Sequence, residues 1–156
     1  MNKRDFIAAA ATLLIFLPSC FTSRPEVKVE LQEITRDEEI AVRKTAADFA
    51  GGFVKSLETG DFSHWQKFLA SNGSNDIDQK KFDRMRDELT TMFGKFVKSS
   101  YLGRVVTGKL HNHLWVLTFE KSKEGGTETF EIVYFVRVHS EKGKAPTVNK
   151  FGVKIF

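Results

Sequence analysis

The chain has 156 residues, of which 41% are hydrophobic and 28% are charged, and it carries a formal net charge of +4. This length and composition are those of one globular domain that follows a short leader. The basic residues do not form a stripe with interleaved aromatic residues, which argues against nucleic-acid binding. The single cysteine, Cys20, excludes an intrachain disulfide.

The first 19 residues have the pattern of a secretory leader. Met1–Arg4 is short and positively charged, and Phe6–Leu17 is predominantly apolar. The apolar stretch fits the core of a signal peptide and is too short for a membrane-spanning helix, which needs ~20 residues. We therefore expect residues 1–19 to be a signal peptide.

The leader ends in Leu17-Pro18-Ser19-Cys20, which resembles the bacterial lipobox. Leu17, the small Ser19 and the cysteine stand where that motif has them, whereas Pro18 is an unusual occupant of its position. The resemblance implies that Cys20 is acylated and begins the mature protein. Each buried CH₂ contributes ~0.8 kcal/mol, so several acyl chains anchor a protein stably to a membrane. By the same resemblance, Phe21 implies the outer membrane, facing the periplasm, if the cell is Gram-negative. The alternative is an ordinary secretory leader with a coincidental cysteine.

Residues 20–35 are predicted to be the lipidated N-terminus and a tether. Pro25 and alternating charges leave this stretch without helical periodicity. Val27, Val29 and Leu31 alternate along it in the manner of a short edge strand. The folded domain is then expected over residues 36–156.

The first half of that domain is predicted to be helical. Thr35 and Glu38 match a capping box at the start of a long helix, and Gly60 is its expected end. Gly51 and Gly52 inside this helix indicate close packing against a neighbour or a kink. The apolar residues that recur at three- and four-residue spacing are Val42, Ala46, Phe49, Phe53 and Leu57.

Two further helices are predicted after Gly60. A short one begins at Ser63, and a third is capped by Asp78 and ends near Gly94. The expected apolar stripe of the third helix consists of Phe82, Met85, Leu89, Met92 and Phe96.

The remainder of the chain alternates with the period of two that is typical of strands. The predicted strands are residues 96–108, a run beginning at Leu114, a run beginning at Phe130 and residues 150–155. Gly103 and Gly108 would allow bulges in the first strand. Short polar turns at Ser122–Gly126 and Ser140–Pro146 predict antiparallel neighbours.

The predicted sheet also has a face that points away from the helices. Val133, Phe135 and either Leu114 or Trp115 make this face apolar at mid-sheet, whereas a solvated face would be polar. We therefore predict a homodimer through the outer face at Val133 and Phe135.

This order of elements resembles the NTF2-like superfamily, and Leu57–Phe62 and Met92–Lys95 mark the resemblance. It covers roughly residues 36–156, and small secreted bacterial domains of unknown function in that superfamily look similar. The resemblance implies an α+β fold, an NTF2-like cone in which three N-terminal helices pack on a curved antiparallel sheet of about four strands. It also implies a pocket between the first helix and the concave face, and dimers through the outer face.

The aromatic residues expected near this pocket or in the core are Phe53, Trp65, Tyr101, Trp115 and Tyr134. Core packing is the simpler role for each of them, and the two tyrosines would also donate hydrogen bonds into a pocket. The sequence therefore predicts a lipid-anchored envelope protein. Its non-catalytic domain would bind a small apolar ligand, a peptide or a partner protein, with no cofactor.

Two alternatives remain open. NTF2-like enzymes use a buried carboxylate base, but Asp48 lies beside the apolar stripe and Asp61 suits a loop or cap, so no catalytic residue is assigned. The same helix-on-sheet shape occurs in cystatins, and Arg104–Gly108 partly matches their Gln-Val-Val-Ala-Gly inhibitory loop. Arg104 replaces the glutamine of that loop, and the later Pro-Trp pair is missing.

His111 and His113 have the spacing of two metal ligands on one face of a strand. A zinc site needs a third and a fourth ligand, and neither His64 nor His139 has a spacing relation to them. The sequence therefore favours a polar hairpin tip or the start of a strand, and it predicts no metal.

Overall fold

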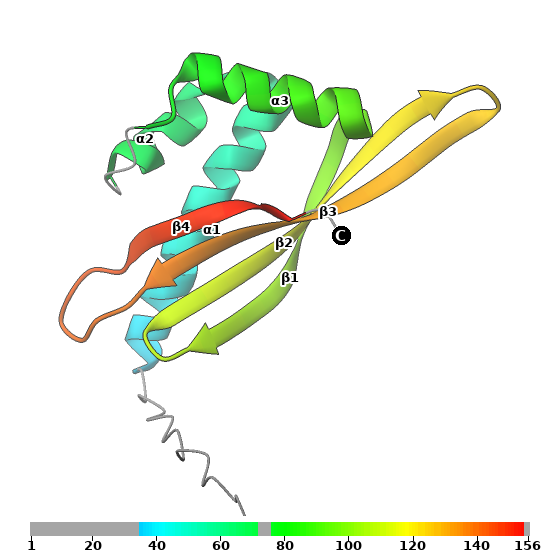
Figure 1. Ribbon diagram of the computed structural model, residues 1–156. Coiled ribbons are helices and arrows are strands. Elements are labelled where there is room, and N and C mark those ends of the chain that lie inside the picture. The colour runs from blue at the N-terminus through cyan, green and yellow to red at the C-terminus, as the bar shows by residue number, and fades with distance from the viewer. Residues whose placement is uncertain (1–34, 72–75, 155–156) are drawn as a thin grey trace, which may run out of the picture.

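Three helices precede a four-stranded antiparallel sheet, which confirms the predicted α+β order. The computed structural model describes residues 35–71 and 76–154 (Figure 1), so the predictions for the leader, Cys20, the tether and Ile155 lie outside it. The elements are α1 (Arg36–Thr59), α2 (Ser63–Ser71), α3 (Gln79–Phe93), β1 (Lys95–Thr107), β2 (Leu110–Lys123), β3 (Gly126–His139) and β4 (Thr147–Lys154).

The first helix begins and ends where its sequence signals predict. The Glu38 amide donates to the Thr35 hydroxyl over 3.2 Å, and the Thr35 amide donates to the Glu38 carboxylate over 2.9 Å, which completes the capping box. Gly60 ends the helix in the left-handed conformation at φ 75°. The buried face includes all five predicted stripe residues, which are Val42, Ala46, Phe49, Phe53 and Leu57.

The glycine pair in α1 serves close packing on one side only. A Cβ on Gly52 would come 2.6 Å from the ring of Phe68 and 2.8 Å from the backbone oxygen of His64, so α2 lies directly against α1 at this point. A Cβ on Gly51 would have nothing within 4 Å. Of the two explanations for this pair, the structure supports close packing.

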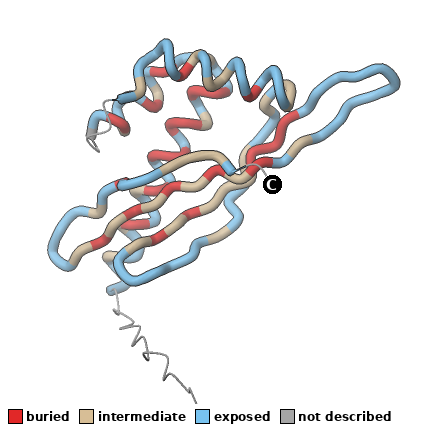
Figure 2. The backbone as a smooth tube through the Cα atoms, in the orientation of Figure 1, coloured by how far each residue is buried: buried red, intermediate tan, exposed pale blue. Residues whose placement is uncertain are grey.

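The strands follow one another across the sheet in the order β1-β2-β3-β4, and every pair is antiparallel. Buried positions alternate along most of β3 and at the start of β2, as the red segments of Figure 2 show, and these positions form the inner face that covers α1. In β2 the alternation is interrupted at Leu117–Phe119, where three successive residues are buried. The predicted second strand was too short, because β2 begins at Leu110 and not at Leu114.

The irregularity predicted for the first strand is present, but not at both glycines. The pairing of β1 with β2 shifts between Tyr101 and Gly103, where a bulge was expected. A second shift lies between Phe96 and Lys98. The expectation of a bulge at Gly108 was wrong, because Gly108 lies in the turn from β1 to β2 at φ 58°.

The register decides which side chains form the outer face. Leu114 pairs with Phe135, and Trp115 pairs with Tyr134, so Leu114 joins the outer face and Trp115 the inner face. Val133, Phe135 and Leu114 are each half-buried, with no helix of the described chain over them.

The third helix packs less closely than its stripe predicts. Phe82 and Leu89 are buried, but Met85 is only half-buried and Met92 is 47% exposed. One side of α3 therefore stands away from the core. Among the residues described, no helix is both long and apolar enough to cross a membrane.

Candidate functional site

A cleft of about 190 Å³ lies where α3 stands away from the core. The described helices and strands contribute its wall: Phe53 from α1, Trp65 from α2, Met85, Glu88, Leu89 and Met92 from α3, Tyr134 from β3, and Phe151, Gly152 and Val153 from β4. Three of the five aromatic residues expected near a pocket, Phe53, Trp65 and Tyr134, lie along this wall.

Aromatic stacking fixes the floor of the cleft. The rings of Phe53 and Tyr134 stack with centroids 4.5 Å apart and planes inclined by 22°. Trp65 packs against Phe53 at 4.8 Å and edge-on against Phe151 at 5.2 Å. Such pairs contribute ~0.5–1.5 kcal/mol each beyond their buried area, so this floor is held rigidly by residues from α1, α2, β3 and β4.

Two polar atoms of the floor are buried without a partner. Trp65 Nε1 and the Tyr134 hydroxyl have no hydrogen-bond partner among the residues described. Burial also raises the pKa of Tyr134, so its hydroxyl stays protonated. An unmet buried donor costs ~1–3 kcal/mol. Both atoms are shielded from solvent, so a ligand acceptor would recover this free energy only if the cleft opens further to reach them.

The opposite wall of the cleft is formed by α3. Met85 and Met92 have flexible thioether side chains that adapt to the shape of what they contact. Glu88 is exposed, and it is the one carboxylate among the described residues that line the cleft. The wall can therefore adjust to a ligand while the aromatic floor stays fixed.

The other two expected pocket aromatics lie outside this cleft. Tyr101 is 44% exposed on β1, and Trp115 is half-buried on β2. Their rings contact each other at 5.3 Å, and Trp115 reaches Tyr134 at 6.3 Å. They connect the cleft floor to a second group of side chains near the start of α1.

That second group is centred on two buried histidines. His111 and His113 are 0% and 1% exposed, so the expectation of a polar hairpin tip was wrong and that of a strand start is confirmed. The Tyr101 hydroxyl lies 3.1 Å from Nδ1 of His113. The other three ring nitrogens of the pair have no hydrogen-bond partner in the described part of the chain.

The environment of these histidines favours the neutral imidazole. Burial, followed by the charges of Arg104, His111 and Arg43, lowers the pKa of His113 to about 4. The pKa of His111 is also lowered, first by burial and then by Arg104, while Glu39 acts in the opposite direction. Both histidines are therefore uncharged near neutral pH.

Charged side chains of α1 and β1 surround the histidines at the rim. Arg104 forms an ion pair with Glu39 over 2.9 Å, and the Arg43 guanidinium lies 5.8 Å from the centre of the Tyr101 ring. The described residues contain no group of three or more His, Cys, Asp or Glu side chains that could hold a metal ion.

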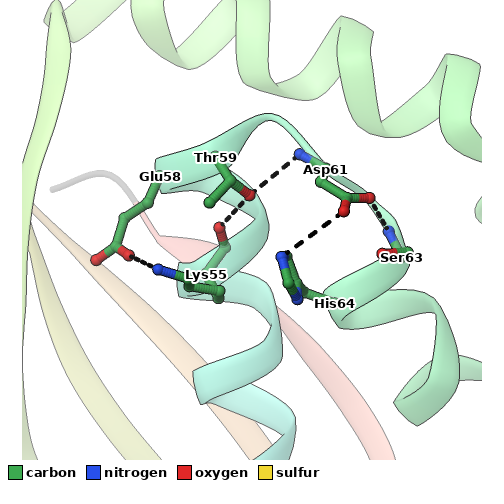
Figure 3. Close-up of polar contacts among 6 residues, drawn as sticks. All are labelled: Lys55, Glu58, Thr59, Asp61, Ser63 and His64. Carbon is green, nitrogen blue, oxygen red and sulfur yellow. Dashed lines mark hydrogen bonds and ion pairs between the residues drawn. The ribbon is translucent and has the colours of Figure 1, made fainter.

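The two aspartates considered for acid–base chemistry lie at the surface. Asp48 is paired with Lys44 on the exposed side of α1. Asp61 accepts a 2.9 Å hydrogen bond from the Ser63 amide, and its other oxygen lies 3.7 Å from Nε2 of His64 (Figure 3). Hydrogen bonds from Ser63 lower the pKa of Asp61, as expected for a carboxylate that caps a helix.

A larger groove of about 620 Å³ runs along the outside of α3. All of its described lining residues belong to that one helix, and most are charged, for example Lys80, Asp83, Arg84 and Asp87. Because no second element faces these side chains, the groove has no opposing wall, and the smaller cleft is the better candidate site.

Comparisons with protein-family models, with curated proteins and with solved structures find no match to this chain.

Proposed function

We propose that this protein is a lipid-anchored component of the cell envelope whose domain binds a small apolar ligand in the cleft between α3 and the aromatic floor. The observation that carries the proposal is the pair of buried, unpartnered donors, Trp65 Nε1 and the Tyr134 hydroxyl, beneath a cleft whose lining is apolar apart from Glu88. A protein that only needed a packed core would gain stability by replacing them with apolar groups.

The size and chemistry of the cleft restrict the ligand. Its volume of about 190 Å³ is below the roughly 300–1,000 Å³ of sites for drug-sized molecules. The exposed carboxylate of Glu88 at the wall disfavours an anion. We infer a neutral, mainly apolar ligand, or the apolar end of a longer one, with a single acceptor oxygen.

Native mass spectrometry of the full acylated chain, released from detergent, tests this proposal. The unmodified protein is expected to carry an additional mass that solvent extraction recovers for identification. Tyr134→Phe removes one donor and Met85→Trp fills the cleft, so both variants should lose that mass. Tyr101→Phe, outside the cleft, is the matched control and should keep it. Unmodified protein without any additional mass would contradict binding in the cleft.

The envelope location rests on the leader. The sequence Leu17-Pro18-Ser19-Cys20 supports acylation of the cysteine, and α1 begins sixteen residues after that cysteine, which leaves a tether between membrane and domain.

The apolar outer face at Val133 and Phe135 supports a homodimer, although a partner envelope protein or a peptide would use the same surface.

Protease inhibition is a second candidate, and one observation favours it. Val105 and Val106 are 54% and 47% exposed beside the β1–β2 turn. The loop at Ser140–Pro146 and the start of α1 lie at the same end of the sheet (Figure 1), so three segments meet there. A titration against papain tests this candidate. No inhibition by micromolar protein would exclude it, and inhibition lost on Val105→Glu would establish it.

The acid–base enzyme has less support. Asp48 and Asp61 are engaged at the surface, and Glu88 is exposed. The buried imidazole of His113, hydrogen-bonded to Tyr101, is the observation that favours this alternative. An unchanged electrophilic probe, such as p-nitrophenyl acetate, after incubation with the full chain would count against it.

A further inference from the structure

The buried histidine pair occupies the interface between the first half of α1 and the β1–β2 side of the sheet. His111 pairs across the sheet with Val106 of β1 and Val138 of β3. His113 pairs with Arg104 and Val136. Both side chains therefore belong to the inner face that α1 covers, and neither contributes to the cleft described above.

The hydrogen-bond inventory at this interface suits neutral imidazoles only. One nitrogen of His113 contacts the Tyr101 hydroxyl, and three nitrogens of the pair have no partner in the part of the chain that the structure describes. A protonated imidazole has two N–H donors and a charge, and burying it without acceptors is far more costly than burying the neutral ring.

The surrounding charges act in the same direction. From α1, Glu39 and Arg43 face the pair, and from β1, Tyr101 and Arg104 do so. Glu39 is already engaged by Arg104. The neighbours on the other strands are apolar: Val136 and Val138 on β3, with Val148 and Phe151 beyond them on β4. A positive charge on either histidine would therefore lie near two arginines and only one carboxylate, Glu39, which already pairs with Arg104.

The two halves of α1 are held to the sheet by different contacts. The second half carries Phe49 and Phe53, which pack into the aromatic floor through Phe151 and Tyr134. The first half has the small buried side chains of Val42 and Ala46 and the partly exposed ion pair of Glu39 with Arg104. The first half is consequently the part that separates at the lower free-energy cost.

We infer that His111 and His113 form an acid-sensitive latch, which holds the first half of α1 on the sheet while both imidazoles are neutral and releases it when they are protonated. This inference goes beyond the proposed function and does not depend on it. Release would expose the inner face of the sheet at the β1–β2 turn, where Val42 and Ala46 now cover it.

The direction of the pH dependence follows from the lowered pKa values. In the open form the histidines regain an ordinary pKa near 6.5, whereas in the closed form that of His113 is about 4. The open form thus binds more protons between these values, and the closed form is most stable above about pH 6.5. His113 increases the ratio of open to closed molecules about tenfold per pH unit as the pH falls through this window, and His111 acts in the same direction.

Hydrogen exchange of the full detergent-solubilised chain, read by mass spectrometry at pH 7.5, 6.5, 5.5 and 4.5 and corrected for intrinsic exchange, tests the latch. Peptides from residues 36–46 are expected to lose protection as the pH falls, before peptides from residues 49–59 and from β3 do. The double variant His111→Leu with His113→Phe should keep its protection across the range. His64→Gln, at a half-buried histidine of α2 outside this interface, should behave like the unmodified chain.

Three results would overturn the inference: equal loss of protection in the double variant, simultaneous loss over all of α1, or no loss down to pH 4.5. If the double variant does not fold, imidazole NMR of the unmodified chain decides the question. The latch requires His111 and His113 to stay neutral until residues 36–46 open. Titration of His113 near pH 6.5 in the closed form would contradict it.

Discussion

The rings of Tyr134 and Phe53 stack with their centroids 4.5 Å apart, while the hydroxyl of the same Tyr134 has no hydrogen-bond partner among the described residues. The stack fixes the position of α1 over β3. The hydroxyl adds nothing to this packing that a phenylalanine would not supply.

Replacing Tyr134 with Phe should therefore stabilise the ligand-free domain. The substitution keeps the stack and removes a buried unpaired hydroxyl, so the free energy of unfolding is expected to rise by about 1 kcal/mol. Urea unfolding measures the change. Tyr101→Phe is the matched control, because it removes the hydrogen bond to His113 and should lower stability by about 1 kcal/mol. Equal effects of the two substitutions would contradict this account.

The two glycines of α1 should respond to alanine with opposite signs. Gly52→Ala places a methyl group against Phe68 and the backbone of His64, and α2 has to shift, which costs about 1–3 kcal/mol. Gly51→Ala faces open space and should stabilise the helix by about 0.5–1 kcal/mol. Thermal unfolding of both variants checks the prediction, and destabilisation by Gly51→Ala would show that α1 is contacted on its outer side.

The outer face of the sheet gives a test of the predicted dimer. Phe135 covers Gly152 and lies 5.9 Å from the Lys154 amine, so its ring is only half-buried within one chain. Phe135→Lys should dissociate a dimer and leave the fold intact, as measured by analytical ultracentrifugation and circular dichroism. Ile132→Lys, on the inner face at 2% exposure, should unfold the domain. A monomer with native Phe135 would exclude this interface.

The lipid anchor is tested at its single cysteine. Cys20→Ala should abolish incorporation of radiolabelled palmitate and shift the protein from the membrane fraction to the soluble fraction, because no acyl chain remains to be buried in the bilayer. Normal labelling and fractionation of this variant would show that the leader is not a lipobox.

Local signals were sufficient to predict the helices and most of the sheet. The ends of α1 are set by hydrogen bonds between near neighbours in the sequence, at Thr35 and Glu38 and at Gly60. Helical periodicity places Phe49 and Phe53 on the buried face of this helix. These features depend on neighbours in the sequence, so the sequence is enough to find them.

The buried histidines were missed for a reason that the sequence itself contains. The alternation that assigns Trp115 and Leu117 to one face, extended backwards, assigns His113 and His111 to the same face. The polar residues before Leu114 favour a hairpin tip, and a strand start at Leu114 leaves both histidines outside the strand. Their burial then depends on how far α1 extends over the sheet, which no local pattern reports.

The cleft also required the tertiary structure. Met85 and Met92 belong to the predicted stripe of α3, and periodicity alone assigns them to the core. Whether they touch the sheet depends on how α3 is set by its connections to α2 and β1. In the structure one side of α3 stands away from the sheet, and this leaves a cleft where a filled core was expected.

The meander of the sheet has a consequence for how the molecule is made. Each strand pairs with its neighbour in the sequence, so the three hairpins form through contacts between residues that are close in the sequence. The cleft is different, since the contact of Trp65 with Phe151, at 5.2 Å, joins α2 to β4. A chain that emerges N-terminus first can therefore complete its hairpins in turn, while the cleft forms only when β4 has joined the sheet.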